Sequence, residues 1–256
     1  MNSTTLKLIQ TNSAIKGNIN SFMSESDCAL VNPSFNVDNW GGEMLKNDIR
    51  WKWGVPPSTN INYAWLSHII NQLNQNGIAA TVLANVSLAS ANDEGIIRQN
   101  MITADLVDCI VALPDKLFYS TGISVCIWIM NRNKSHKGKT LFIDGRKLGT
   151  MVTRRLRELT DEEVRKIADT YINYKNDENY EDIQGFCKVA NLDEIRENDY
   201  ILTPGRYVGI EDAEDDGEPF EEKMERLTQQ LAQQFQKSKE LEDEIRKQLG
   251  GIGYEL

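Results

Sequence analysis

The stretch Leu106-Val-Asp-Cys-Ile-Val-Ala-Leu113 is followed, ten residues later, by Ser124-Val-Cys-Ile-Trp-Ile-Met130. Both are short apolar runs bounded by turn residues, as is typical of buried strands. The connection contains Gly122 and is too short for a helical crossover. We therefore expect two antiparallel strands that are neighbours in one sheet.

Upstream of this pair, apolar runs alternate with helical patterns. Cys28–Val31 and Ile78–Leu83 have the character of strands, whereas Tyr63–Leu73 and Gly95–Ala104 have the three-to-four-residue spacing of helices. Asn76-Gly77 is expected to end the first of these helices. The alternation indicates an α/β domain with parallel strands.

Downstream, the pattern becomes more helical. Lys139–Asp144 is a further strand candidate, and Thr160–Glu163 is a capping-box pattern that predicts the start of a helix. A last long helix is predicted over Phe220–Leu249, where apolar residues recur three or four positions apart for most of its length. Gly250-Gly251 is expected to end it.

Composition sets the class of protein. The chain has 256 residues of which 40% are hydrophobic, enough for a substantial core in one or two domains. Met1–Asn20 does not have the pattern of a signal peptide, and no apolar run reaches the length of a membrane span. We expect a cytoplasmic protein without a membrane partner.

The charge is unevenly distributed along the chain. The net charge is -10, and nine acidic residues fall between Glu211 and Glu225. Lys46–Lys52 and Asn131–Arg157 are locally basic. Since Lys and Arg drive phosphate binding, any DNA contact is expected in the first two-thirds of the chain.

The cysteines do not indicate a metal site. Cys28, Cys109, Cys126 and Cys187 are far apart, and only two histidines are available to join them. No spacing typical of zinc ligands is present. We expect reduced thiols that behave as small hydrophobic side chains, and no metal.

The candidate catalytic residues directly follow the first predicted strand. Asn32-Pro33-Ser34-Phe35 would lie at a strand's carboxyl end, where open α/β sheets bind ligands. The group suits amino methylation, because an Asn oxygen and a backbone carbonyl can accept the two hydrogens of an adenine amino group while an aromatic ring stacks on the base. Taken alone, the tetrapeptide is also compatible with an ordinary turn.

The tetrapeptide resembles the Asn-Pro-Pro-Phe/Tyr motif of amino methyltransferases, and nearly the whole chain resembles the modification subunit of type I restriction-modification systems. The stretches that carry this resemblance are Asp38–Glu43, Trp51–Pro57, Asn62–Leu66, Ala84-Asn85, Ile97-Arg98, Ala104–Pro114, Leu117–Thr121, Leu141–Asp144, Arg157–Thr160, Ile167–Tyr171, Leu202–Val208 and Asp215–Met224. So many ordered matches favour the methyltransferase interpretation over the turn.

The resemblance implies a DNA adenine methyltransferase that uses S-adenosylmethionine. Asn32 and the Pro33 carbonyl would bind the target amino group, and Phe35 would stack on the flipped adenine. Ser34 departs from the family, which usually has a second proline there. By analogy with other proline substitutions, this loss should cost about 0.4–1 kcal/mol of preorganisation.

The family's cofactor turn is missing from the sequence. A glycine-rich turn and an acidic residue would precede the motif by some tens of residues, but only 31 residues precede Asn32, and Gly17 is the one glycine before Asp27. The cofactor-binding residues therefore stay unassigned. We expect a fragment that does not bind S-adenosylmethionine or methylate DNA alone.

The expected fold class is α/β, a partial Rossmann-like methyltransferase sheet with the later strands only, followed by a helical C-terminal region. The expected parts are a lead-in segment (1–26), the C-terminal half of the methyltransferase domain (27–158), a helical or irregular extension with an acidic linker (159–219), and a long helix with a tail (220–256).

A tryptophan-rich connection follows the motif. Aromatic and basic residues alternate in it and suit contact with DNA backbone and unstacked bases. The candidates are Trp40, Lys46, Arg50, Trp51, Lys52 and Trp53. Equally, the tryptophans could fix the loop to its own domain.

The family resemblance also implies partners. These are the specificity subunit, the restriction subunit and DNA, with Met224, Leu227 and Leu231 on the last helix expected to contact the specificity subunit. The alternative hypothesis is a non-catalytic interaction module. Without its neighbouring strands, the strand ending at Val31 would have an open edge, which we expect Thr4–Ile15 or a second copy to cover.

Overall fold

A computed structural model describes residues 26–210, 220–251 and 254. These described residues fall into two units, which divide between Glu211 and Asp212. In the first unit, the strands are β1 (Ser26–Val31), β2 (Leu73–Ala84), β3 (Val107–Ala112), β4 (Val125–Asn131), β5 (Lys139–Asp144), β6 (Thr150–Met151), β7 (Arg157–Glu158) and β8 (Cys187–Asn191). The α-helices are α2 (Asn62–Gln72), α3 (Asn92–Thr103), α4 (Asp161–Asn176), α5 (Leu192–Glu197) and, in the second unit, α6 (Phe220–Gly251). Short 3-10 helices are η2 (Gly42–Leu45), η3 (Asn85–Leu88) and η4 (Pro204–Arg206).

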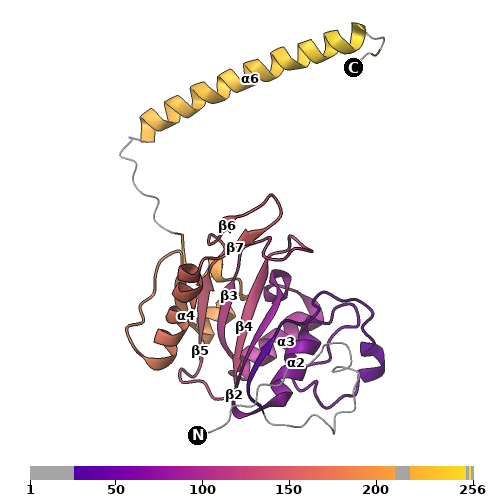
Figure 1. The fold of residues 1–256 in the computed structure, drawn as a ribbon, viewed down its shortest axis with the longest axis vertical. Coiled ribbons are helices and arrows are strands. Elements are labelled where there is room, and N and C mark those ends of the chain that lie inside the picture. The colour runs from indigo at the N-terminus through magenta and orange to yellow at the C-terminus, as the bar shows by residue number, and fades with distance from the viewer. Residues whose placement is uncertain (1–25, 211–219, 252–253, 255–256) are drawn as a thin grey trace. The chain divides into compact units, whose positions relative to one another are not determined.

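Six strands form one mixed sheet in the order β1-β2-β4-β3-β5-β8 (Figure 1). β1, β2, β3 and β5 run in one direction, whereas β4 and β8 run in the opposite direction. The predicted antiparallel pairing of Val107–Ala112 with Val125–Asn131 is confirmed. Because four strands share a direction, their carboxyl ends lie along the same edge of the sheet.

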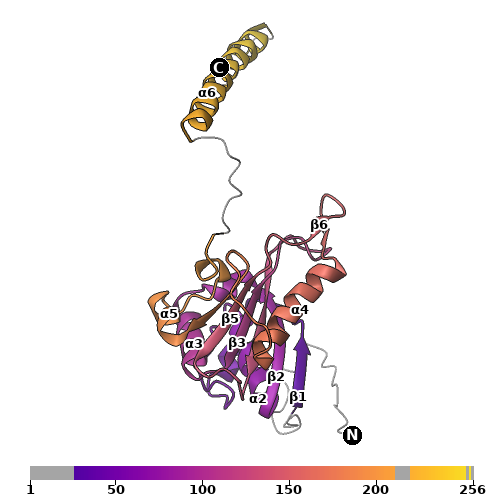
Figure 2. The same cartoon turned by 90° about the vertical axis from the view of Figure 1, so that its left-hand side faces the viewer.

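Helices cover both faces of this sheet (Figure 2). On one face, α2, α3 and α5 pack on a core that contains Trp128, Phe142 and Ile110. On the other face, α4 packs on a core that contains Cys109, Val111 and Leu141. Successive residues of β3 thus enter opposite cores, as strand geometry requires, and every residue of this strand is buried.

A local signal in the sequence accounts for the start of α4. α4 begins with the predicted capping box: the Thr160 hydroxyl accepts a hydrogen bond from the Glu163 amide, and the Glu163 carboxylate accepts one from the Thr160 amide. α6 covers the predicted long helix and ends at Gly251.

Two sequence expectations are corrected. Asn76-Gly77 does not end a helix: α2 ends at Gln72 and the pair lies inside β2, where a Cβ on Gly77 would come 2.7 Å from the Ser26 carbonyl oxygen. The glycine allows close strand approach at a β-bulge. Second, the region after Thr160 is not only helical or irregular, since β8 pairs with β5 in the main sheet.

The lead-in segment with Thr4–Ile15 and most of the acidic linker, residues 211–219, lie outside the described residues. Among the described helices, none combines the length and apolarity needed to cross a membrane. The four cysteines are free thiols, of which Cys28 is half-buried and the other three are buried.

Candidate active site

The loop Asn32–Phe35 directly follows β1 at the carboxyl edge of the sheet. Asn32 is exposed, and its side chain has no hydrogen bond to the described part of the chain. Pro33 is buried and Phe35 is half-buried. The amide of Asn32 is therefore available to a ligand, while its neighbours fix the loop.

Helix α2 holds this loop from its N-terminal turns. The buried Trp65 ring donates a hydrogen bond from Nε1 to the Ser34 carbonyl oxygen at 3.1 Å. Asn62, which is fully buried, makes a reciprocal pair with Asn36: its Oδ1 accepts from the Asn36 amide and its Nδ2 donates to the Asn36 Oδ1, both at 2.8 Å. Asn36 has a φ of 56°, a left-handed conformation that asparagine tolerates better than most residues.

A second loop meets Phe35 from the far side of β2. Phe118, in the connection between β3 and β4, packs edge to face on Phe35 with ring centroids 6.3 Å apart. The sequence alone does not predict Phe118, Trp65 or Asn62 as site residues. All three fall within stretches that carry the family resemblance, but their pattern alone gave no reason to place them beside the motif.

The same edge of the sheet carries the turns that follow β1, β2 and β3. No glycine-rich turn follows β1, β2 or β3 at this edge within the described residues. Gly145 follows β5, but a Cβ there would come 3.0 Å from the Ala112 carbonyl oxygen, so this glycine serves strand packing. The described residues at this edge therefore do not form a glycine-rich cradle of the kind that holds a nucleotide-like cofactor. In the same part of the chain, no group of three His, Cys, Asp or Glu side chains is arranged for a metal ion.

The tryptophan-rich connection packs on its own domain. Trp40 and Trp51 are buried and meet edge to face at 6.1 Å, and the Trp40 Nε1 donates to the Pro57 carbonyl oxygen at 3.0 Å. Trp53 is half-buried against the same core. These contacts favour the interpretation in which the tryptophans fix the loop.

The basic residues of this connection differ in exposure. Arg50 is buried and pairs with Asp48 at 2.7 Å, while its other terminal nitrogen donates to Nδ1 of His68 at 2.9 Å. Burial and the Arg50 charge lower the pKa of His68 to about 4. Lys46 and Lys52 are exposed, and Lys46 lies 3.5 Å from Glu43. Among the basic residues of this connection, only these two lysines present positive charge to a ligand in solution.

The part of the connection around Arg50 lies away from the Asn32 loop. The Asn71 side chain donates to the Arg50 carbonyl oxygen at 2.9 Å, whereas Asn62 binds Asn36 at the other end of α2. Asn71 lies nine positions after Asn62 in the helix, about 13 Å along the axis. The structure therefore does not bring Arg50 next to Asn32.

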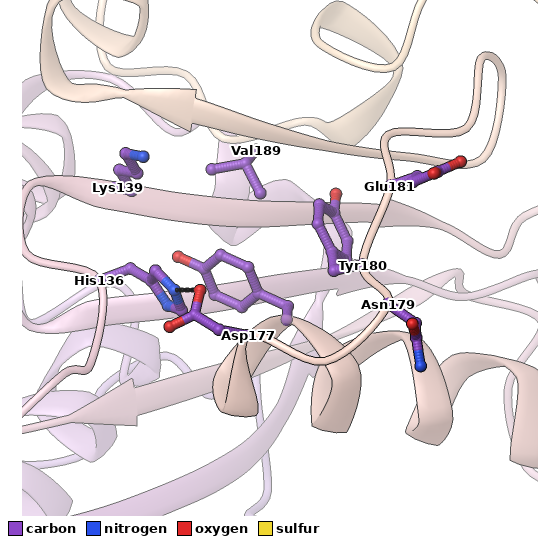
Figure 3. Close-up of a pocket in the computed structure, with 8 residues that line it drawn as sticks. His136, Lys139, Asp177, Asn179, Tyr180, Glu181 and Val189 are labelled. Carbon is purple, nitrogen blue, oxygen red and sulfur yellow. Dashed lines mark hydrogen bonds and ion pairs between the residues drawn. The ribbon is translucent and has the colours of Figure 1, made fainter.

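A surface hollow of about 340 Å³ opens at the opposite edge of the sheet (Figure 3). Its lining residues are His136, Lys139, Tyr174, Asp177, Asn179, Tyr180, Glu181 and Val189. His136 Nε2 lies 2.7 Å from the Asp177 carboxylate, and its ring stacks on Tyr174. Because Lys139 begins β5 whereas Asn32 follows the end of the parallel β1, this hollow does not belong to the Asn32 loop.

The proposed partner residues lie in the second unit. Met224, Leu227 and Leu231 are about half exposed on α6, and the same helix also exposes Phe235, Leu241 and Ile245. An apolar stripe thus runs along a helix of 32 residues.

Comparison with known proteins relates the chain to DNA methylases. The N-6 DNA Methylase family matches residues 2–216. The chain is 50% identical over 269 aligned positions to the type I restriction enzyme HindI methylase subunit of Haemophilus influenzae, covering 99% of this chain and 61% of the relative. It is 40% identical to the MjaIX methylase subunit of Methanocaldococcus jannaschii, covering 89% of this chain and 42% of the relative. The chain thus spans about half the length of these curated relatives.

Solved structures agree with this relationship. The type I restriction-modification methyltransferase subunit from Streptococcus thermophilus superposes with a TM-score of 0.66 at 29% identity, covering 73% of this chain and 39% of that one. The M protein of the type I restriction enzyme EcoKI, at 16% identity, shares the fold with a TM-score of 0.57 over 90% of this chain and 54% of its own.

Proposed function

This chain belongs to the N-6 DNA methylase family, and from that membership we propose that it supplies the target-base part of a type I restriction-modification methyltransferase. The complete enzyme transfers a methyl group from S-adenosylmethionine to the amino group of adenine in a specific DNA site. The observation that carries the proposal is the Asn32–Phe35 loop, with a free asparagine amide beside a braced aromatic ring at the carboxyl edge of the sheet.

Asn32 and Pro33 would act on the amino group of a flipped adenine. The lone pair of this nitrogen is delocalised into the ring, which makes it a poor nucleophile. Hydrogen bonds from its two hydrogens to Asn32 Oδ1 and to the Pro33 carbonyl oxygen localise the lone pair toward the methyl donor. The hydrogen bond from Trp65 to the next carbonyl, that of Ser34, holds the backbone in place during this step.

Phe35 would hold the base by stacking once it has left the duplex. An aromatic ring accepts a base at little conformational cost if it is already oriented. The edge of Phe118 supports that orientation. The chemistry then rests on orientation and hydrogen bonding, while S-adenosylmethionine, when bound by the complete enzyme, supplies the methyl group and its leaving group.

We propose that the cofactor cradle comes from polypeptide outside this chain, so that this chain alone neither binds S-adenosylmethionine usefully nor methylates DNA. The sheet supports this arrangement. β1 is the first strand in the sheet order, and its outer side pairs with no described strand. Its Leu30 side chain is 72% exposed. Strands of the complete methyltransferase domain, Thr4–Ile15 or a second copy of the chain would cover this edge.

The test is a reconstitution. The chain is assayed for methyl transfer to DNA alone and after mixing with the separately produced remainder of the Haemophilus influenzae relative. We expect N6-methyladenine only in the mixture. Activity of the chain alone would contradict the missing cradle, and no activity in either sample would favour a non-catalytic interaction module.

The second candidate function, partner binding, is favoured by α6. We propose that Met224, Leu227 and Leu231 contact the specificity subunit, because a long helix with an exposed apolar stripe is stabilised by packing against a partner. Leu227→Asp with Leu231→Asp should abolish co-purification with that subunit, whereas Gln229→Asp with Gln233→Asp, on the opposite side of the helix, should not. Retention of the complex by the leucine variant would contradict the proposal. The restriction subunit would join the complete system in turn.

For DNA, we propose that Lys46 and Lys52 contact phosphates beyond the target base, with Trp53 supporting their segment from the core side. Trp40, Trp51 and Arg50 would contribute by packing, since they are buried.

A further inference from the structure

The basic stretch between β5 and α4 forms a small hairpin that the Asn32 loop does not explain. β6 and β7 pair through Thr150 with Glu158 and Met151 with Arg157. The hairpin follows β5, so it projects from the carboxyl edge, the edge toward which β1 also points (Figures 1 and 2). Residues 145–158 carry five Lys or Arg residues and one Glu.

The turn of this hairpin is built as a defined structure. The Leu156 carbonyl oxygen accepts hydrogen bonds from the amides of Val152 and Thr153, at 2.9 and 3.2 Å. The Thr153 hydroxyl accepts from the amides of Arg155 and Leu156, at 3.2 and 3.0 Å. Leu156 is buried and anchors the turn.

Two arginines, Arg154 and Arg155, lie at the tip of this turn. Arg146 pairs with Asp144 at 2.6 Å, and Arg157 binds the carbonyl oxygens of Leu148 and Gly149. Arg154 and Arg155, by contrast, are exposed and their side chains have no ion-pair or hydrogen-bond partner among the described residues. Two adjacent guanidinium groups are thus held out on an ordered turn.

The hairpin is connected to the Asn32 loop through the β3–β4 connection. The Arg157 amide donates to the Lys116 carbonyl oxygen at 2.8 Å, and Phe118, two residues further on, packs on Phe35. On its other side, the Gly149 amide donates to the Glu163 carboxylate at 2.7 Å, which fixes the hairpin to the start of α4. Contacts therefore link three segments at this edge: the Asn32 loop, the β3–β4 connection and the hairpin that carries the arginines.

We propose that the turn Thr153–Leu156 contacts the DNA backbone, with Arg154 and Arg155 binding phosphates beside the target adenine. The proposal rests on the proposed function, in which DNA enters at the Asn32–Phe35 loop. Guanidinium groups bind phosphate oxygens in a bidentate manner, and such contacts position a duplex without reading its sequence. In a chain with a net charge of -10, a local cationic element beside the base site would let the phosphate backbone approach.

The salt dependence of DNA binding tests this contact. The full chain is titrated into a labelled duplex containing a mismatched adenine, which lowers the cost of base flipping, at several salt concentrations. The slope of log K against log salt is negative, and each lost phosphate contact reduces its magnitude by about 0.9. The double variant Arg154→Gln/Arg155→Gln should therefore have a slope about 1.8 less negative than that of the parent chain.

A matched control removes the same charge elsewhere. Lys137 and Lys139 are exposed at the opposite edge of the sheet, so Lys137→Gln/Lys139→Gln should leave the slope unchanged. Thermal unfolding midpoints equal to that of the parent would show that both variants fold. Equal slopes for the two variants, or no binding of the parent at low salt, would overturn the contact.

The reconstituted methyl-transfer assay separates this proposal from the function on which it rests. Methylation that persists with equal slopes would remove the arginine contact only. A reduced slope without any methylation in the reconstituted sample would retain the DNA contact and reject the methyltransferase assignment.

Discussion

The ring of Phe35 packs edge to face against the ring of Phe118, with centroids 6.3 Å apart and ring planes at 64°. The two residues are 83 positions apart in the chain and belong to loops at the same edge of the sheet. The contact joins the loop proposed to bind adenine to the connection between β3 and β4, which in turn contacts the β6–β7 hairpin.

Removing the edge contact should weaken base stacking without unfolding the domain. Edge-to-face pairs contribute about 0.5–1.5 kcal/mol beyond area burial, so Phe118→Leu should slow methyl transfer by the reconstituted enzyme about two- to tenfold. The adjacent Tyr119, which is 88% exposed, provides the control Tyr119→Ala, with an unchanged rate. Equal rates for both variants would show that Phe118 does not orient Phe35.

Arg50 and Lys52 should separate stability from DNA binding. Arg50→Ala leaves the buried Asp48 carboxylate without its partner and should lower the free energy of unfolding by about 3–5 kcal/mol. Lys52→Ala, at an exposed position, should change it by no more than about 0.5 kcal/mol. Denaturant titration measures both. A stable Arg50→Ala protein with weakened DNA binding would return Arg50 to the DNA-contact group.

The buried His68 should make the protein less stable in mild acid. In the folded protein the pKa of His68 is lowered to about 4. In the unfolded chain His68 binds a proton near pH 6.5, whereas in the folded protein it stays neutral at that pH. The free energy of unfolding should then fall as the pH drops below about 6.5, by about 2 kcal/mol at pH 5, and this contribution should level off below the folded pKa.

His68→Gln is the matching variant, since its side-chain carbonyl can still accept from Arg50 but does not titrate. Its stability should change less than that of the parent between pH 7 and pH 5 in denaturant titrations. The same pH dependence in both proteins would mean that His68 is not the titrating group.

The order of elements could be predicted from periodicity because the core strands are apolar runs of ordinary length. Val107–Ala112 and Val125–Asn131 are antiparallel neighbours, as the short connection between them predicts. The prediction that Gly77 ends a helix is wrong because a glycine after a helical pattern is typical of a helix C-terminus. Only the position of the neighbouring Ser26 carbonyl shows that this glycine serves strand pairing. β8 was missed because its pairing with β5 is a long-range contact that local pattern does not encode.

The candidate site could be proposed from the sequence only where its residues are neighbours in the chain. Asn32–Phe35 could be singled out because all four residues of the motif are consecutive and directly follow a strand. The sequence could not separate the buried Trp40, Arg50 and Trp51 from the exposed Lys52. Aromatic and basic residues have the same spacing in the sequence whether their side chains face solvent or the core. The contacts of Phe118, Trp65 and Asn62 with the loop depend on how the chain folds back on itself.

The most direct measurement is single-turnover methyl transfer by the reconstituted enzyme with Asn32→Ala, followed by mass spectrometry of the DNA. Removing one preorganised hydrogen-bonding group from a reacting centre typically slows chemistry about 10²–10³-fold. We predict such a loss of N6-methyladenine formation for Asn32→Ala, and the parental rate for Asn76→Ala, an exposed asparagine at the opposite edge of the sheet. Parental N6-methyladenine formation by Asn32→Ala would contradict the assignment of the Asn32–Phe35 loop as the target-adenine site.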